Sequence, residues 1–353
     1  MRLRITHETV YDYRPAVETA QHMAYLTPLQ TSAQRLLSRE LEVFPSPARL
    51  SETQDVFGNT RSFFSLQVPH RQLRVLAHSE VMTQASSLPT STLAWESVRE
   101  RLRYQAGEPF DPASEFVFAS PMVPRQSEFA LYGRPSFPPG RPVLAGALDL
   151  MHRIFTDFTY ESQSTEVNTP ALVALTQRKG VCQDFAHILI ACLRSLGLAA
   201  RYVSGYLLTL PAPGTVKLKG SDASHAWGAV YVPDLPLGQR WVDLDPTNDR
   251  AGWLSPGEDY VTLAIGRDFS DVSPLRGVIH GGASHTLKVG VTVEPVAEWP
   301  GMMAAQTQLQ GPGQFQTQGH GTGSDFGQSQ SQSAASSGTP VTSQTQNQSL
   351  LKL

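Results

Sequence analysis

Cysteine is scarce in this sequence: there are two, Cys182 and Cys192, in 353 residues. Both lie in one apolar segment that is predicted to be helical, and at about 1.5 Å rise per residue they are roughly 15 Å apart, beyond the reach of a disulfide. A zinc site made of thiolates needs more cysteines than this. We therefore predict two free thiols, no metal or other cofactor, and a chain that works in a reducing compartment, the cytoplasm.

Long apolar runs and an excess of charge of one sign are also missing. No stretch of about 18 apolar residues is present, so no membrane-spanning helix is expected. The N-terminal MRLRITHETVYDY alternates like a strand and lacks the apolar centre of a secretory signal. The formal net charge of −3 gives no field that would attract nucleic acid or an anionic membrane. Neither is an expected partner, and the oligomeric state stays open.

The first part of the chain, residues 1–83, predicts a β domain. The segments LRITHETVYDY, RSFFSLQV and LRVLAHSEVMT have the composition of strands. Alternation in the first segment places five residues on one face: Leu3, Ile5, His7, Thr9 and Tyr11. Turn chemistry comes from Asp55, Gly58 and Asn59. Several short strands separated by turns favour a small, sandwich-like domain.

Three further parts follow. Residues 84–142 contain one predicted helix, WESVRERLRY, and a Pro- and Gly-rich passage, and we interpret them as a connector. Residues 143–296 hold three helical patterns, of which VCQDFAHILIACLRSLG is the strongest, and then the strand candidates ARYVSGYLLTL, HAWGAVYV and RWVDLD. A buried helix followed by antiparallel strands predicts an α+β core. Residues 297–353, rich in Gln, Ser, Gly and Thr, predict a disordered tail.

Cys182 is the candidate nucleophile. It follows Gly180 at the first turn of the strongest helix, where uncapped N–H groups and the positive end of the helix dipole favour an anion such as a thiolate. Cys192 lies in the middle of the same helix among Ile, Leu and Ala, and we interpret it as core packing. For Cys182 alone, packing would be as good an explanation as catalysis. Its partners decide between them.

Two histidines could serve as the base that a thiol nucleophile needs. His187 is about 140° around the helix from Cys182 and roughly 7 Å along it, so it is expected to point away. His225 opens the strand HAWGAVYV, and a strand end beside a helix N-terminus is a place where a site could assemble. We therefore choose His225.

Asp245 is the third candidate, from strand pairing. If HAWGAVYV and RWVDLD form a hairpin, Tyr231 lies opposite Arg240 or Trp241, and Ala226 or Trp227 lies opposite Asp245. His225 is then within diagonal reach of Asp245. A slip of one residue would turn the side chains to the other face of the sheet, so this register is a prediction that the structure must test.

Four ordered motifs carry a resemblance to a known family. GVCQDFAHILIACLRSLG, ARYVSGYL, SDASHAW and WVDLDPTN together resemble the bacterial transglutaminase-like family, and the β region with its DVFGN turn resembles the N-terminal region that accompanies that core. The resemblance implies a papain-like α+β core with Cys182 as nucleophile, His225 as general base and acid, and Asp245 as the orienting carboxylate. It also implies that Trp227 walls the site.

The roles of two further residues are open. Asp184 matches the family motif and is taken as a substrate-site residue, although an Asp in the first helical turn is also favourable to the dipole. Tyr160 is a candidate second donor to the oxyanion, with a core aromatic as the alternative.

The resemblance implies acyl chemistry through a thioester, with a peptide or protein amide as substrate. Water would make the enzyme a cysteine peptidase or amidase, and an amine would make it a protein-glutamine γ-glutamyltransferase. We favour hydrolysis because water is far more abundant than any amine. A calcium switch is not expected, since no D-x-[DN]-x-[DN]-G pattern is present. A non-catalytic binding module is the remaining alternative.

Overall fold

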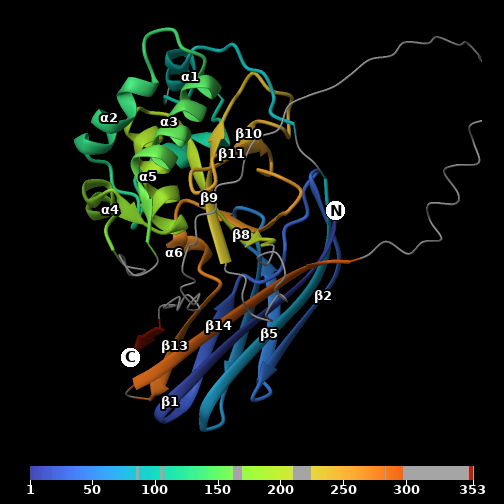
Figure 1. Ribbon diagram of the computed structural model, residues 1–353. Helices are drawn as coiled ribbons and strands as arrows, with labels where there is room; N and C mark the ends of the chain where they lie inside the picture. The colour runs from blue at the N-terminus through green and yellow to red at the C-terminus, as the bar shows by residue number, and fades with distance from the viewer. Residues whose placement is uncertain are drawn as a thin grey trace, which may run out of the picture. The chain divides into compact units, whose positions relative to one another are not determined.

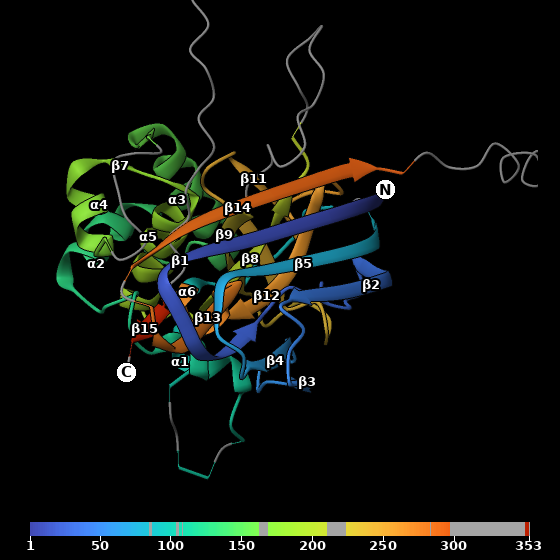
Figure 2. The ribbon, with the colours of Figure 1, turned by 90° about the horizontal axis from the view of Figure 1, so that it is seen from below.

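Strand β1 (Arg2–Ala24) organises the N-terminal β region because it pairs along both of its halves. In this computed structural model the first half of β1 pairs with β5 (His70–Thr83) and β14 (Ser284–Pro295). The second half pairs with β4 (Thr60–Leu66) and β13 (Leu275–Gly281). Figure 2 shows β14, β1, β5 and β2 (Gln34–Phe44) side by side. The last strand, β3 (Arg49–Gln54), pairs with β4.

The residues described are 1–84, 87–103, 106–107, 109–161, 169–209, 224–282, 284–296 and 350–352. The predicted alternation is confirmed: Leu3, Ile5, His7, Thr9 and Tyr11 are all buried. A cluster of side chains from both halves of the sheet, including Tyr11, Val17, Phe64, Leu73 and Ile279, forms a core between them. This is the predicted sandwich-like arrangement.

The predicted turn at Asp55–Asn59 is also confirmed. One carboxylate oxygen of Asp55 accepts hydrogen bonds from the backbone N–H groups of Phe57 and Asn59, both at 2.9 Å. Gly58 has a φ of +84°, which only glycine adopts without strain. The turn is therefore formed by the Asp55 carboxylate and by the positive φ of Gly58, as its sequence predicts.

The second layer is the predicted α+β core. Its sheet has the order β11-β10-β9-β8-β12, with bounds Arg250–Trp253, Trp241–Asp245, Ser224–Tyr231, Ala200–Leu207 and Tyr260–Gly266. Helix α5 (Cys182–Ser195) packs on β9 and β8, and Gly197, with a φ of +83°, follows its C-terminus. Three further helices of this part are α3 (Val143–Asp157), α4 (Ala171–Gln177) and α6 (Phe269–Val272). Figure 1 shows α3, α4 and α5 gathered on one side of this sheet.

Residues 84–142 are part of the core and do not form a separate connector. They contain α1 (Trp95–Arg101), α2 (Ser127–Gly133) and two short 3-10 helices, η1 (Pro112–Val117) and η2 (Arg134–Ser136). Their buried side chains belong to the same hydrophobic cluster as α3 and α5: Trp95, Val98, Phe116, Phe129 and Phe137. The Pro- and Gly-rich passage suggested a loop, but its aromatic residues supply apolar surface that the core buries.

The predicted boundaries need a second correction, at the C-terminal end. β13 and β14 lie within the range 143–296 assigned to the core, yet they pair with β1. A strand joins the edge that offers free backbone groups, and sequence proximity does not fix that choice. The predicted tail, 297–353, lies outside the described residues except for β15 (Leu350–Lys352), which pairs in parallel with β13.

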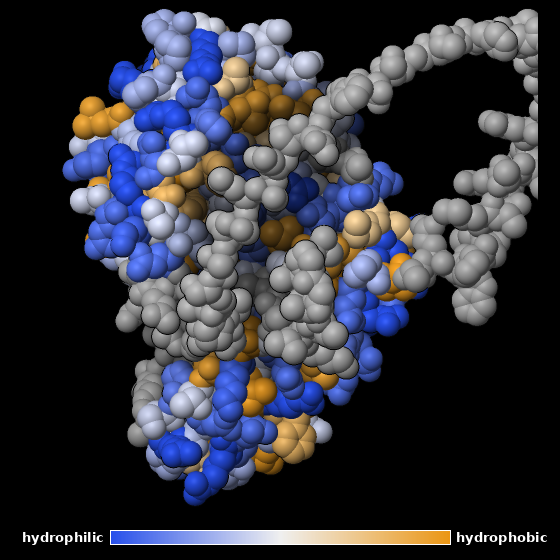
Figure 3. All heavy atoms as spheres, in the orientation of Figure 1, coloured by the Kyte–Doolittle hydropathy of each residue, from blue (hydrophilic) through white to orange (hydrophobic). Residues whose placement is uncertain are grey.

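Hydrophilic residues cover most of the visible surface of the helical layer, with hydrophobic residues in small separate groups (Figure 3). Within the described ranges every helix is too short or too polar to pass through a lipid bilayer.

Candidate functional site

Cys182 is the first residue of α5. The chain reaches it through β7 (Lys179–Gly180), which pairs in parallel with β6 (Thr159–Tyr160). The first N–H groups of a helix have no partner within it, so this position favours a negatively charged sulfur. The residue is buried and retains 5% exposure. Both cysteines are free thiols, as predicted.

His225 lies at the start of β9, next to Cys182. Its Nε2 is 2.7 Å from Asp245 Oδ2, and Cys182 is near enough to contribute to the raised pKa of His225. Because Nε2 faces the carboxylate, the other ring nitrogen, Nδ1, is the one available to the thiol. The structure thus brings the three predicted residues together.

The predicted register of β9 and β10 is confirmed. Trp241 lies opposite Tyr231, Asp243 opposite Ala229 and Leu244 opposite Gly228. One step further along the ladder brings Asp245 beside Trp227 and within diagonal reach of His225. A hairpin with this register is sufficient to make the His–Asp pair.

Electrostatics favour an ion pair between His225 and Asp245. Burial acts to lower the pKa of His225, but the charge and the hydrogen bond of Asp245, with a smaller contribution from Cys182, outweigh it and raise the pKa to about 10. Burial acts to raise the pKa of Asp245, and it is held below its usual range by the charge of His225 and by donated hydrogen bonds. The imidazole therefore carries a proton over most of the physiological pH range.

Asp245 accepts three hydrogen bonds besides the one from His225. Its Oδ1 accepts the Thr247 backbone N–H at 2.9 Å. Its Oδ2 accepts the Asn248 side-chain amide and the Tyr260 hydroxyl, each at 2.7 Å. Neither Asn248 nor Tyr260 was predicted from the sequence. Asn248 had a local signal, since it follows Asp245 by three residues in an Asp-Pro-Thr-Asn turn. Tyr260 had none, since it comes from another strand.

Trp227 supports the histidine from inside the protein. It is fully buried, and its ring lies 5.9 Å from the His225 ring and 5.4 Å from the Tyr260 ring. Its indole N–H donates to Asp243 Oδ2 at 2.8 Å. The prediction that Trp227 walls the site needs correcting, because a side chain with no exposed surface cannot touch a substrate. It holds the imidazole in place.

Gly205 makes room for Trp227, and its substitution should be costly. It pairs with His225 across β8 and β9. A Cβ at this position would lie 2.1 Å from the Val261 carbonyl oxygen and 2.5 Å from the Trp227 ring. We expect Gly205→Ala to lower the free energy of unfolding in urea by about 3 kcal/mol. The control is Gly228→Ala on β9, whose nearest neighbour would be the tip of the Leu189 side chain at 3.1 Å. It should cost less than about 1 kcal/mol, and equal losses would contradict the prediction.

Asp184 and Tyr160 lie on either side of the helix start. Asp184 is buried, and its Oδ2 accepts the Val181 backbone N–H at 2.9 Å, which is a helix-capping role. Gly180 permits this approach, since a Cβ there would be 2.8 Å from the Asp184 carboxylate. Tyr160 is 45% exposed, so the alternative that it is a core aromatic is wrong. Its backbone pairs with Gly180, two residues before Cys182.

The two residues interpreted as packing have that role. His187 is buried, its Nε2 accepts the Phe269 backbone N–H at 3.2 Å, and burial lowers its pKa to about 4. Cys192 is fully buried, and burial raises the pKa of its thiol.

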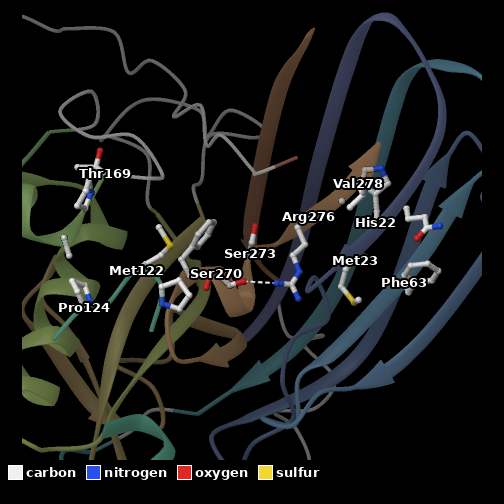
Figure 4. Close-up of a pocket in the computed structure, with 16 residues that line it drawn as sticks. His22, Met23, Phe63, Met122, Pro124, Thr169, Ser270, Ser273, Arg276 and Val278 are labelled. Carbon is white, nitrogen blue, oxygen red and sulfur yellow. Dashed lines mark hydrogen bonds between the residues drawn. The ribbon is translucent and has the colours of Figure 1, made fainter. Parts of the chain in front are cut away.

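A cavity of about 780 Å³ lies away from the triad. Its walls come from β1, β4 and β13 on one side and from α4, α6 and residues 121–124 on the other, and they include Met23, Phe63, Met122, Phe269 and Arg276. Figure 4 shows Arg276 turned toward Ser270, whose carbonyl accepts a hydrogen bond from Nη1 at 2.8 Å. Cys182, His225 and Asp245 do not line it. Among the described residues, no three His, Cys, Asp or Glu side chains converge as a metal site.

A helix that begins with a cysteine and packs on an antiparallel sheet carrying His and Asp defines a transglutaminase-like core. The chain belongs to the transglutaminase-like superfamily: residues 139–246 match that family, and residues 3–82 match the bacterial transglutaminase-like N-terminal region.

Relatives extend over most of the chain. An uncharacterized protein of Mycobacterium tuberculosis is 40% identical over 300 residues, which cover 83% of this chain and 93% of the relative. An uncharacterized protein of Mycobacterium leprae is 30% identical, with 84% of this chain and 99% of the relative covered. The fold is similar to the crystal structure of a protein from Cytophaga hutchinsonii that is provisionally named a cysteine protease. The TM-score is 0.63 and the identity 24%, with 85% of this chain and 93% of that chain covered.

Proposed function

We propose that this protein is a thiol hydrolase of peptide or amide bonds that works through a Cys182–His225–Asp245 triad. The observation that carries the proposal is the His225 imidazole, which is 2.7 Å from Asp245 through Nε2 and whose pKa is raised by Asp245 and, to a smaller extent, by Cys182. A binding module would not need the Cys182, His225 and Asp245 side chains buried together, because burying charged groups costs desolvation energy. The provisional name of the Cytophaga hutchinsonii protein agrees with this class of activity.

The reaction has two halves. In the resting pair the proton of the Cys182 thiol already lies on His225, and the sulfur attacks the substrate carbonyl carbon to give a tetrahedral oxyanion. The C–N bond then breaks, His225 donates its proton to the departing amine, and a thioester remains. Water attacks the thioester with His225 as base, the C–S bond breaks, and a carboxylic acid and the thiol are released. Asp245 keeps the imidazole oriented and stabilises its charge throughout.

Two donors are proposed for the oxyanion. The Cys182 backbone N–H lies at the start of α5, where the helix dipole adds to its effect. The Tyr160 hydroxyl is the second candidate, because Tyr160 is half-exposed and its strand pairs with the residues that lead into α5. That the protein works in the cytoplasm and binds neither nucleic acid nor a membrane stays a prediction from its composition and charge. That its substrate is a peptide or protein amide stays a prediction from the family resemblance.

Hydrolysis and amine transfer can be separated in one experiment. The full chain is incubated with glutamine-containing peptides and a labelled primary amine, and the products are followed by mass spectrometry. We expect peptide fragments or deamidated peptide without incorporated label, and no product from Cys182→Ala. Stable incorporation of the amine would make the protein a glutamine acyltransferase instead. Cys192→Ala is the matched control and should behave like the wild type, because Cys192 is buried in the core.

A further inference from the structure

Four donors surround the carboxylate of Asp245, and two of the three side chains among them, Asn248 and Tyr260, have no role in the triad so far. Oδ2 accepts from His225, Asn248 and Tyr260, each at 2.7 Å, while Oδ1 accepts from the Thr247 backbone at 2.9 Å. Three of the four donors converge on Oδ2, which has two lone-pair sites, so they share the charge of one oxygen. Asp245 is fully buried, and the donors replace the water that it has lost.

We propose that Tyr260 and Asn248 are positioning residues that donate hydrogen bonds to the same Asp245 oxygen as His225, and that they lower the proton affinity of the imidazole. The proposal rests on the proposed function of the triad. Tyr260 comes from β12, on the far side of β8 and β9 from β10, and Asn248 comes from the turn after β10. Two independent elements therefore fix the direction in which Oδ2 faces the histidine.

The fixed position of Tyr260 supports this role. The residue is buried, and its ring packs edge-on against Trp227 at 5.4 Å. On another side the Arg250 guanidinium lies 4.8 Å from the ring centre. Arg250 is itself held by Asp259 through two hydrogen bonds of 2.6 and 2.7 Å. A hydroxyl held in this way loses little freedom when it donates to Asp245.

The charge of the Asp245 carboxylate decides in which direction Tyr260 and Asn248 shift the pKa of His225. A donated hydrogen bond is strongest when the carboxylate carries its full charge, which is the case when His225 is neutral. Tyr260 and Asn248 therefore stabilise the neutral histidine more than the protonated one. Among the described residues, the titratable groups that face His225 are Cys182 from α5, Asp245 from β10 and Tyr260 from β12, while Arg250 and Asp259 face Tyr260. Easier release of the proton helps His225 to protonate the departing amine.

The test is the titration of His225 itself, which needs no substrate. The full chain contains ten histidines, so NMR spectra of histidine-labelled protein are assigned with His225→Gln. In Tyr260→Phe we expect the pKa of His225 to rise by about half to one pH unit. Turnover should fall roughly threefold to tenfold.

Tyr206→Phe is the matched control. Tyr206 is a buried tyrosine of the neighbouring strand β8, and its hydroxyl is 2.7 Å from His7 Nδ1. This variant loses a comparable hydrogen bond, so its stability should fall as much as that of Tyr260→Phe, while the titration of His225 stays unchanged. A purely structural role for Tyr260 would make the two variants behave alike, and that result would overturn the proposal.

Asn248→Ala keeps the proposal testable if Tyr260→Phe does not fold. Asn248 is exposed, so its loss should be tolerated, and it should raise the pKa of His225 in the same direction by a smaller amount. An unchanged titration in Asn248→Ala would also count against the proposal. If the variants show these shifts in the pKa of His225 but the wild-type protein turns over no amide, the proposed function is refuted. The positioning roles of Tyr260 and Asn248 are not.

Discussion

Replacing Cys182 by alanine should abolish turnover, with a loss on the order of 10⁴- to 10⁶-fold, because no other group in the triad can form the thioester. The sulfur lies near His225, whose pKa is raised, and at the start of α5, and both features favour a negatively charged sulfur. We therefore also expect iodoacetamide to label Cys182 in the folded wild-type chain. Mass spectrometry of the digested protein locates the label.

Cys192 serves as the internal control for this labelling. It is fully buried on the same helix, and burial raises the pKa of its thiol, so it should stay unmodified in the folded protein. Labelling of Cys192 together with Cys182 would indicate unfolding. Equal labelling rates in wild type and His225→Gln would show that the imidazole does not activate the sulfur.

Asp245→Ala should have the second-largest effect, because it leaves a buried imidazole without its counter-charge. Removal of one partner of a buried ion pair typically costs about 3–5 kcal/mol of stability. Loss of the orienting carboxylate should lower turnover on the order of 10⁴-fold. Urea denaturation and product formation measure the two effects separately.

The pH dependence of this loss follows from the pKa of His225, which folding raises to about 10 from an ordinary 6.5. A group whose pKa is raised by folding stabilises the protein fully below the unfolded value, and this contribution is lost as the pH rises through the folded value. The difference in unfolding free energy between wild type and Asp245→Ala should therefore be larger at pH 6.5 than at pH 10. A constant difference would show that the two groups are not paired.

Asp268→Ala controls for the general cost of losing a buried carboxylate. Asp268 is fully buried and accepts backbone hydrogen bonds from Met122 at 2.7 Å and from Ser270 at 2.8 Å. Its removal should destabilise the protein without the large fall in turnover expected for Asp245→Ala. If Asp268→Ala lowered turnover as much as Asp245→Ala, the effect of Asp245→Ala could not be assigned to the triad.

The sequence by itself determined the features that depend on neighbouring residues. Alternation fixed the buried face of β1, and the helical period placed Cys182 at the start of α5 and Cys192 inside it. The register between β9 and β10 could also be predicted, because a hairpin aligns two strands that are close in the chain. Those two inferences were enough to choose His225 and Asp245.

Only the tertiary structure decided what depends on residues far apart in the chain. Tyr260 reaches Asp245 from another strand, Trp227 turns its indole to Asp243 and not to a substrate, and β13 and β14 pair with β1 instead of the core sheet. The physical reason is the same in each case. A side-chain hydrogen bond or a strand edge is satisfied by whichever partner the packed chain brings near, and hydrophobic periodicity carries no information about that partner.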